Sequence, residues 1–220
     1  MPTTEKARAE DVIEISDLQG GYADYQVLYN ISLKLYEGCI TTIIGPNGCG
    51  KSTLLKTITR YLPMFSGSIR CNGQDISIYS RKEFARLVSI LPQWREVPSI
   101  TAEQLVFHGR FPHLGFARKT TERDVEICRQ AMQETGTLDM RQRDIRELSG
   151  GERQRVYLAM TLAQDSKYIL LDEPTTYLDI AQKYEIMELI CRICAMGKTI
   201  IMTLHDLPLA FAYSDKVVVM

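Results

Sequence analysis

The order of apolar and polar positions predicts an α/β chain that begins with antiparallel strands. Residues 12–18 and 27–35 alternate apolar and polar side chains, as half-buried antiparallel strands do. Later runs are short and almost wholly apolar, which is typical of strands covered on both faces of a parallel sheet. We place strands at residues 12–18, 27–35, 40–44, 68–72, 88–91, 168–171, 198–203 and 217–220, and helices at residues 51–60, 101–109, 121–136, 152–164, 180–194 and 207–213.

Three of these helical patterns follow one another in the middle of the chain and interrupt the alternation of strands and helices. We therefore expect a core formed by residues 1–94 and 165–220, with the β-rich opening as part of it, and an inserted helical subdomain at residues 95–164.

Composition and charge narrow the classes of function. The chain has 220 residues, of which 45% are hydrophobic and 24% are charged, as in ordinary globular proteins. A net charge of -1 gives no support for nucleic-acid binding. No apolar run approaches the roughly 20 residues that span a bilayer, so work at a membrane would need another chain. The sequence shows no secretion signal, and we expect its six cysteines, including the close pair Cys191 and Cys194, to be reduced thiols.

A glycine-rich loop between a predicted strand and a predicted helix carries the first chemical signal. Its glycines allow successive backbone N–H groups to curve around phosphate oxygens, and the following helix adds its positive end. Lys51 should reach the β- and γ-phosphates of ATP, and the Ser52 hydroxyl should ligate Mg²⁺. The loop consists of Gly45, Pro46, Asn47, Gly48, Cys49, Gly50, Lys51, Ser52 and Thr53.

Polar residues follow three further strands. Gln93 comes after residues 88–91, Asp172 and Glu173 after residues 168–171, and His205 after residues 198–203. In a parallel sheet these strand ends share one edge, where ligands bind. Asp172 is suited to hold Mg²⁺ and Glu173 to polarise the attacking water.

Two features have a structural and a functional interpretation. Ser149, Gly150 and Gly151 open a helix, either as a simple cap or as an anion-binding end. Tyr22 follows two glycines, where packing beside a turn explains it as well as a functional role does.

Together these motifs resemble the nucleotide-binding subunit of ABC transporters over nearly the whole chain. The resemblance implies the ABC ATPase fold: an α/β P-loop NTPase core, an N-terminal antiparallel β-subdomain and an inserted α-helical subdomain. It also implies a head-to-tail homodimer that encloses two ATP molecules. Ser149, Gly150 and Gly151 of one copy would grip the γ-phosphate on the other, Asp179 would couple the two sites, Gln93 would sense Mg²⁺ and water, His205 would touch the γ-phosphate, and Tyr22 would stack on adenine.

The segment from Gly109 to Gly115, with the residues around Tyr177 and His205, is similar to the import subfamily for iron chelates, haem and cobalamin. This implies an ATP hydrolase on the inner face of the cell membrane, working with permease subunits and indirectly with a substrate-binding protein. The alternative is a soluble ABC ATPase in iron–sulfur cluster assembly or translation. A chromosome-maintenance ATPase is disfavoured, because that group has a long coiled coil where this chain has a short helical segment. The chain stops at Met220 within an apolar run where relatives continue, so the end is either natural or that of a fragment.

Overall fold

The computed structural model describes residues 11–23, 25–93, 96–115 and 120–220, which contain two β-sheets. The antiparallel sheet has the order β2-β1-β4-β5, and the parallel sheet has the order β6-β7-β8-β3-β9. The strands of the first sheet are β1 (Asp11–Tyr22), β2 (Tyr25–Tyr36), β4 (Met64–Cys71) and β5 (Gln74–Asp75), and those of the second are β3 (Ile40–Ile44), β6 (Val88–Leu91), β7 (Tyr168–Asp172), β8 (Thr199–Thr203) and β9 (Lys216–Val219).

Alternate residues of the parallel strands supply two separate hydrophobic cores. In β7, Ile169 and Leu171 pack into one core while Tyr168 and Leu170 pack into the other, as the period of two in a strand requires. Burial on both faces explains why β3, β7 and β8 lack the alternating pattern of β1 and β2.

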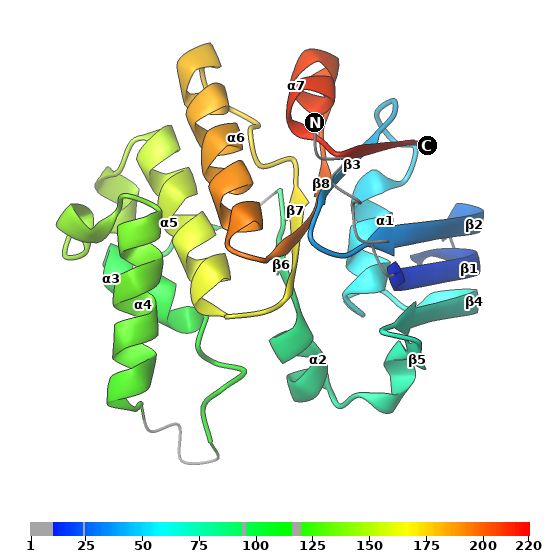
Figure 1. Ribbon diagram of the computed structural model, residues 1–220, viewed down its shortest axis with the longest axis horizontal. Coiled ribbons are helices and arrows are strands. Elements are labelled where there is room, and N and C mark those ends of the chain that lie inside the picture. Colours follow the sequence, from blue (N-terminus) through cyan, green and yellow to red (C-terminus); the bar gives the residue numbers. More distant parts are fainter. Residues whose placement is uncertain (1–10, 24, 94–95, 116–119) are drawn as a thin grey trace, which may run out of the picture.

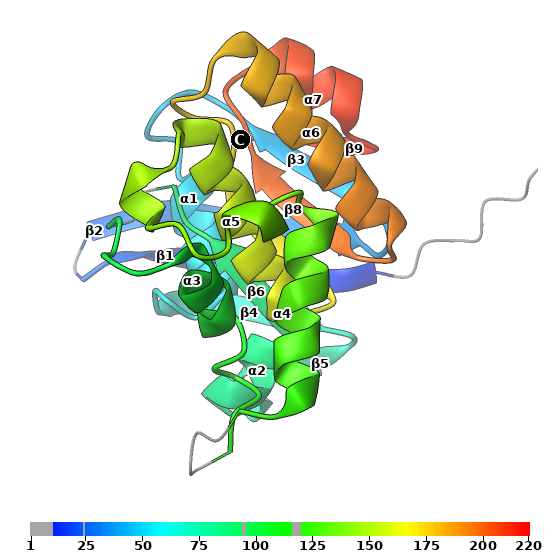
Figure 2. The same ribbon diagram turned by 90° about the vertical axis from the view of Figure 1, so that its left-hand side faces the viewer.

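Helices cover the parallel sheet unequally. One core joins α1 (Lys51–Ile58) to both sheets, so this helix lies between them (Figure 1). The other core joins the opposite face to five further helices (Figure 2). Those helices are α3 (Ala102–His108), α4 (Glu122–Glu134), α5 (Gly150–Ala163), α6 (Ile180–Ala195) and α7 (Leu207–Tyr213); α2 (Arg81–Leu87) precedes β6, and short 3₁₀ turns occupy Ile76–Ile78, Leu138–Met140 and Ile145–Glu147.

The structure differs from the sequence predictions mainly outside the parallel sheet. Helix α2 was not predicted, although Ser80 and Glu83 form a reciprocal capping box at its start. Strand β1 extends to Tyr22 because Gly20 and Gly21 pair with β2 across register shifts rather than ending the strand. The predicted boundary between core and helical subdomain, at residues 94–95, lies outside the described residues.

Candidate functional site

The site lies at the carboxyl edge of the parallel sheet, where neighbouring strands end. Strands β6, β7, β8 and β3 are adjacent in that order and run parallel, so the residues that follow them meet. A cavity of about 560 Å³ opens there. Its lining consists of Tyr22, Tyr25, Val27, Asn47, Gly48, Gly50, Lys51, Ser52, Thr53, Gln93, Glu173 and His205.

The glycine-rich loop forms the floor of this cavity. Gly48 and Gly50 have φ angles of 82° and 106°, which residues with a Cβ rarely adopt. Gly50 also caps α1 without a side chain, so the N–H groups of the first helical turn face the cavity. Lys51 is only 5% exposed, and its Nζ donates to the carbonyl oxygens of Gly45 at 2.9 Å and Pro46 at 3.1 Å. An ammonium group and helix-end amides directed at one space fit a phosphate chain.

A hydroxyl and a carboxylate meet beside the loop. Ser52 Oγ donates to Asp172 Oδ1 over 2.8 Å, and Asp172 is buried at the end of β7. Both groups offer the hard oxygen atoms that Mg²⁺ prefers, and Mg²⁺ is commonly held by few protein ligands together with phosphate oxygens and water. The pair therefore fits a magnesium ion that is bound together with a phosphate.

Glu173 points its carboxylate at the polar groups that follow the neighbouring strands. It has a φ of 50°, an uncommon conformation for a residue with a side chain. Gln93 Nε2 and Thr176 Oγ1 donate to its Oε2 over 2.5 Å and 2.9 Å, and His205 Nε2 hydrogen-bonds its Oε1. A carboxylate held at the cavity wall in this way can orient and polarise a water molecule.

Tyr22 lies at the end of β1, opposite Tyr25 in the tight hairpin to β2, and both residues line the cavity. Directly opposed residues on paired strands point to the same face. Lys56 Nζ donates to the Tyr22 hydroxyl over 3.3 Å and lies 5.7 Å from the ring centroid. This places an aromatic ring beside the loop, as the base-stacking interpretation of Tyr22 requires.

Eight predicted residues are absent from this lining. Gly45, Pro46, Cys49 and Asp172 contact or adjoin residues that line it, whereas Ser149, Gly150, Gly151 and Asp179 lie at the starts of two helices. Ser149 caps α5 by accepting a hydrogen bond from the Glu152 backbone, and Gly151 packs so closely on Gln182 that a Cβ would lie 3.0 Å from that side chain. Gly150, which is exposed, follows Ser149, and Asp179 caps α6 by accepting a bond from the Gln182 backbone. In one copy of the chain Ser149 and Asp179 therefore cap helices, and Gly150 and Gly151 are the first two residues of α5.

Sequence reasoning missed two hydroxyl groups at the site. Thr203 contacts both Asp172 and Glu173, and Thr176 contacts the Glu173 carboxylate. A threonine inside an apolar strand carries no signal beyond its preference for β-structure. Two hydroxyl residues, Thr175 and Thr176, follow Glu173 closely in the chain, but the sequence does not show which of them reaches its carboxylate.

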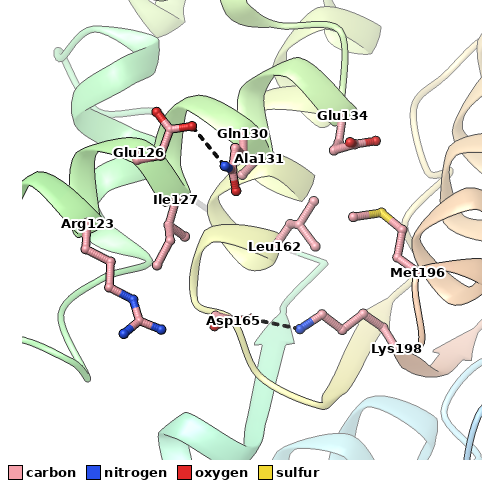
Figure 3. Close-up of a pocket in the computed structure, with 10 residues that line it drawn as sticks. All are labelled: Arg123, Glu126, Ile127, Gln130, Ala131, Glu134, Leu162, Asp165, Met196 and Lys198. Carbon is pink, nitrogen blue, oxygen red and sulfur yellow. Dashed lines mark hydrogen bonds and ion pairs between the residues drawn. The ribbon is translucent and has the colours of Figure 1, made fainter.

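A second hollow, of about 470 Å³, lies between α4, the end of α5 and the residues that precede β8 (Figure 3). Its charged groups are of mixed sign, and several are already paired. Lys198 Nζ is 3.0 Å from Asp165 Oδ1, and Glu126 accepts from Gln130 and Arg129. None of the predicted site residues lies here, and we assign no ligand to it.

Comparisons with known proteins agree with this geometry. The family model described as ABC transporter matches residues 28–176. The iron(3+)-hydroxamate import ATP-binding protein of Bacillus subtilis is 47% identical over 197 residues, which cover 88% of this chain and 73% of that protein. The achromobactin transport ATP-binding protein of Dickeya dadantii is 45% identical over 204 residues, which cover 92% of this chain and 76% of that protein. The ferric enterobactin transport ATP-binding protein of Escherichia coli is 40% identical over 200 residues, covering 90% and 74%.

Solved structures show the same fold. The cbiO1 protein of Clostridium perfringens, part of the ABC transporter complex cbiONQ, superposes with a TM-score of 0.84 at 30% identity, covering 96% of this chain and 85% of that one. A nucleotide-free ATP-binding cassette from an ABC transporter superposes with a TM-score of 0.87 at 23% identity, covering 96% and 88%, and supports the fold alone. The predicted fold class is confirmed. Within the described residues, no helix has the length and apolar character to cross a membrane.

Proposed function

Because this chain belongs to the ABC transporter family and is an ATP-binding protein of the kind that hydrolyses ATP, we propose that it drives the uptake of an iron chelate through partner permeases. Three relatives that cover most of the chain are named for the transport of achromobactin, iron(3+)-hydroxamate and ferric enterobactin. All three names refer to iron chelates or their ligands rather than to haem or cobalamin. They support import over the alternative of a soluble ATPase in iron–sulfur assembly or translation.

In this proposal the glycine-rich loop holds the phosphates of ATP, and Tyr22 stacks on the adenine. Lys51 and the first-turn amides of α1 neutralise the phosphate charge. Ser52 and Asp172 are the groups that would hold Mg²⁺, with Gln93 beside it. When bound, the ion supplies charge stabilisation to the phosphate oxygens.

The catalytic group is the Glu173 carboxylate. It orients the attacking water, and its hydrogen bonds to Gln93, Thr176 and His205 fix its direction before ATP arrives. His205 is then available to touch the γ-phosphate. This constellation at the end of β7, facing the loop, is the observation that carries the proposal.

A second copy completes the site. Ser149 caps α5, and Gly150 and Gly151 are its first two residues, all outside the cavity of their own chain. A head-to-tail partner can therefore present them to the γ-phosphate, and Asp179 lies at the start of α6 to couple the two sites. Loss of the γ-phosphate would remove the contacts that hold the copies together. The same proposal places the chain on the inner face of the membrane, docked on permeases that receive cargo from a substrate-binding protein.

The test is the substitution Glu173→Gln, which keeps the shape of the side chain and removes its charge. We expect ATP hydrolysis to fall by about 10²-fold or more, since general-base contributions are of that order, while ATP affinity is kept and ATP-bound dimers accumulate in size-exclusion chromatography. Glu126→Gln on the exposed face of α4 is the control and should hydrolyse ATP normally. Unchanged turnover in Glu173→Gln would refute the assignment.

Uptake of a radiolabelled ferric siderophore by vesicles carrying the permeases tests the proposed cargo, and uptake of cobalamin alone would contradict it.

A further inference from the structure

The last residue of β8, Thr203, lies beside both carboxylates of the site. Strands β7 and β8 are paired in parallel, with Asp172 opposite Thr203. Thr203 is 0% exposed, so its hydroxyl must find partners inside the protein.

The Thr203 hydroxyl both donates and accepts a hydrogen bond. Thr203 Oγ1 donates to Asp172 Oδ1 over 2.8 Å and accepts the backbone N–H of Glu173 over 2.9 Å. The direction of the first bond is fixed because an ionised carboxylate only accepts, and a hydroxyl has one hydrogen to donate. Ser52 Oγ donates to the same Asp172 oxygen over 2.8 Å, so that oxygen is held from two sides.

The second bond acts at a strained position. Glu173 follows β7 with a φ of 50°, and this turn of the backbone directs its side chain toward Gln93 and His205. An unusual backbone conformation persists only where its surroundings enforce it. The Thr203 hydroxyl is the group that receives the N–H of this residue.

We propose that Thr203 is a positioning residue for ATP hydrolysis: one hydroxyl sets the Asp172 carboxylate and the Glu173 backbone together. It thereby fixes the distance between the Asp172 carboxylate, which we assign to Mg²⁺, and the Glu173 carboxylate, which we assign to the attacking water. This inference rests on the proposed function, because the two carboxylates must act on one ATP for their spacing to matter. If Thr203 only filled space in the core, a side chain of the same shape without the hydroxyl would serve equally well.

Thr203→Val tests this, since valine keeps the shape and loses both hydrogen bonds. We expect kcat to fall about tenfold or more, the effect of losing one hydrogen bond to a charged group such as the Asp172 carboxylate. The affinity for ATP without Mg²⁺, measured by calorimetry, should stay within about twofold, because the phosphate contacts of the loop are untouched. Thr203→Ser restores the hydroxyl and should restore kcat to within about threefold of the native value.

The matched control is Thr199→Val at the opposite end of the same strand. Thr199 is also 0% exposed, and its hydroxyl accepts the backbone N–H of Gly38 over 2.9 Å, far from the carboxylates. Both valine variants lose a buried acceptor, but only Thr203→Val should lose kcat. An equal kcat in the two valine variants, or a serine variant as slow as Thr203→Val, would overturn the proposal.

A readout independent of turnover separates this proposal from the assignment of Glu173. The Glu173 amide should exchange its hydrogen at least about tenfold faster in Thr203→Val than in the native protein or in Thr203→Ser, because its acceptor is gone. If Glu173→Gln hydrolyses ATP normally while this exchange pattern holds, the proposed function fails and the hydrogen bond stands. If exchange is unchanged in Thr203→Val, the positioning proposal fails. Should Thr203→Val not fold, Thr203→Ala is measured in the same way.

Discussion

The buried ion pair between α4 and the segment that follows α3 gives a quantitative test of the fold. Arg110 and Asp124 are 4% and 6% exposed, and Arg110 Nε donates to Asp124 Oδ1 over 2.9 Å. The other Asp124 oxygen accepts from the backbone and the hydroxyl of Thr121. Replacing Asp124 by alanine leaves a buried guanidinium without its counter-charge, a change that costs about 3–5 kcal/mol.

The same helix provides a control ion pair with a similar nitrogen–oxygen distance. Glu126 and Arg129 are 2.8 Å apart, but both side chains are about half exposed, with relative accessibilities of 46% and 49%. Water screens this pair, so Glu126→Ala should leave stability almost unchanged. For a chain of this length, the loss predicted for Asp124→Ala corresponds to a fall in Tm of roughly 6–20 °C.

Urea unfolding followed by circular dichroism measures both variants. An Asp124→Ala variant as stable as Glu126→Ala would show that the pair contributes nothing, and would refute the reasoning.

The effect should also depend on pH. Hydrogen bonds from Thr121, with the charge of Arg110, hold the pKa of Asp124 below its ordinary value. The stability that the ionised Asp124 carboxylate contributes is therefore fully present above its pKa in the unfolded chain, which is about 4. That stability is lost as the pH falls through the lower pKa of the folded protein.

Two further predictions concern nucleotide binding. Lys51→Ala should weaken ATP binding by about tenfold to a hundredfold in calorimetry, since a charge-assisted hydrogen bond contributes about 1.5–3 kcal/mol; unchanged affinity would contradict the role of the loop. Tyr22→Ala should weaken ATP binding about tenfold while Tyr22→Phe keeps it, because base stacking contributes about 1–3 kcal/mol and needs only the ring. A phenylalanine variant as weak as the alanine variant would instead point to the Lys56 hydrogen bond.

The sequence predicts the strands of the parallel sheet, and the edge at which the polar residues after them meet, for a physical reason. Strands covered on both faces are mostly apolar and lack alternation, and β3 and β6 occupy the predicted residues. Polar residues that follow such strands meet at one edge, and there Glu173 hydrogen-bonds both Gln93 and His205.

Other features depend on contacts that are distant in the chain. The pairing of Gly20 with Leu28 extends β1 through residues whose composition predicts a turn. The two partners of Thr203 are 30 and 31 residues away, so no local pattern could reveal them. Helix α2 has only seven residues, and its capping box was the one local signal available.

In the proposed function, the two sheets divide the recognition of ATP between them. The residues that we assign to the phosphates follow neighbouring strands of the parallel sheet, whose separation of about 4.8 Å is set by main-chain hydrogen bonds. Tyr22 and Tyr25 stand instead on a hairpin of the antiparallel sheet. Substitutions in the hairpin can therefore change the selectivity among nucleobases while the spacing that governs turnover stays constant.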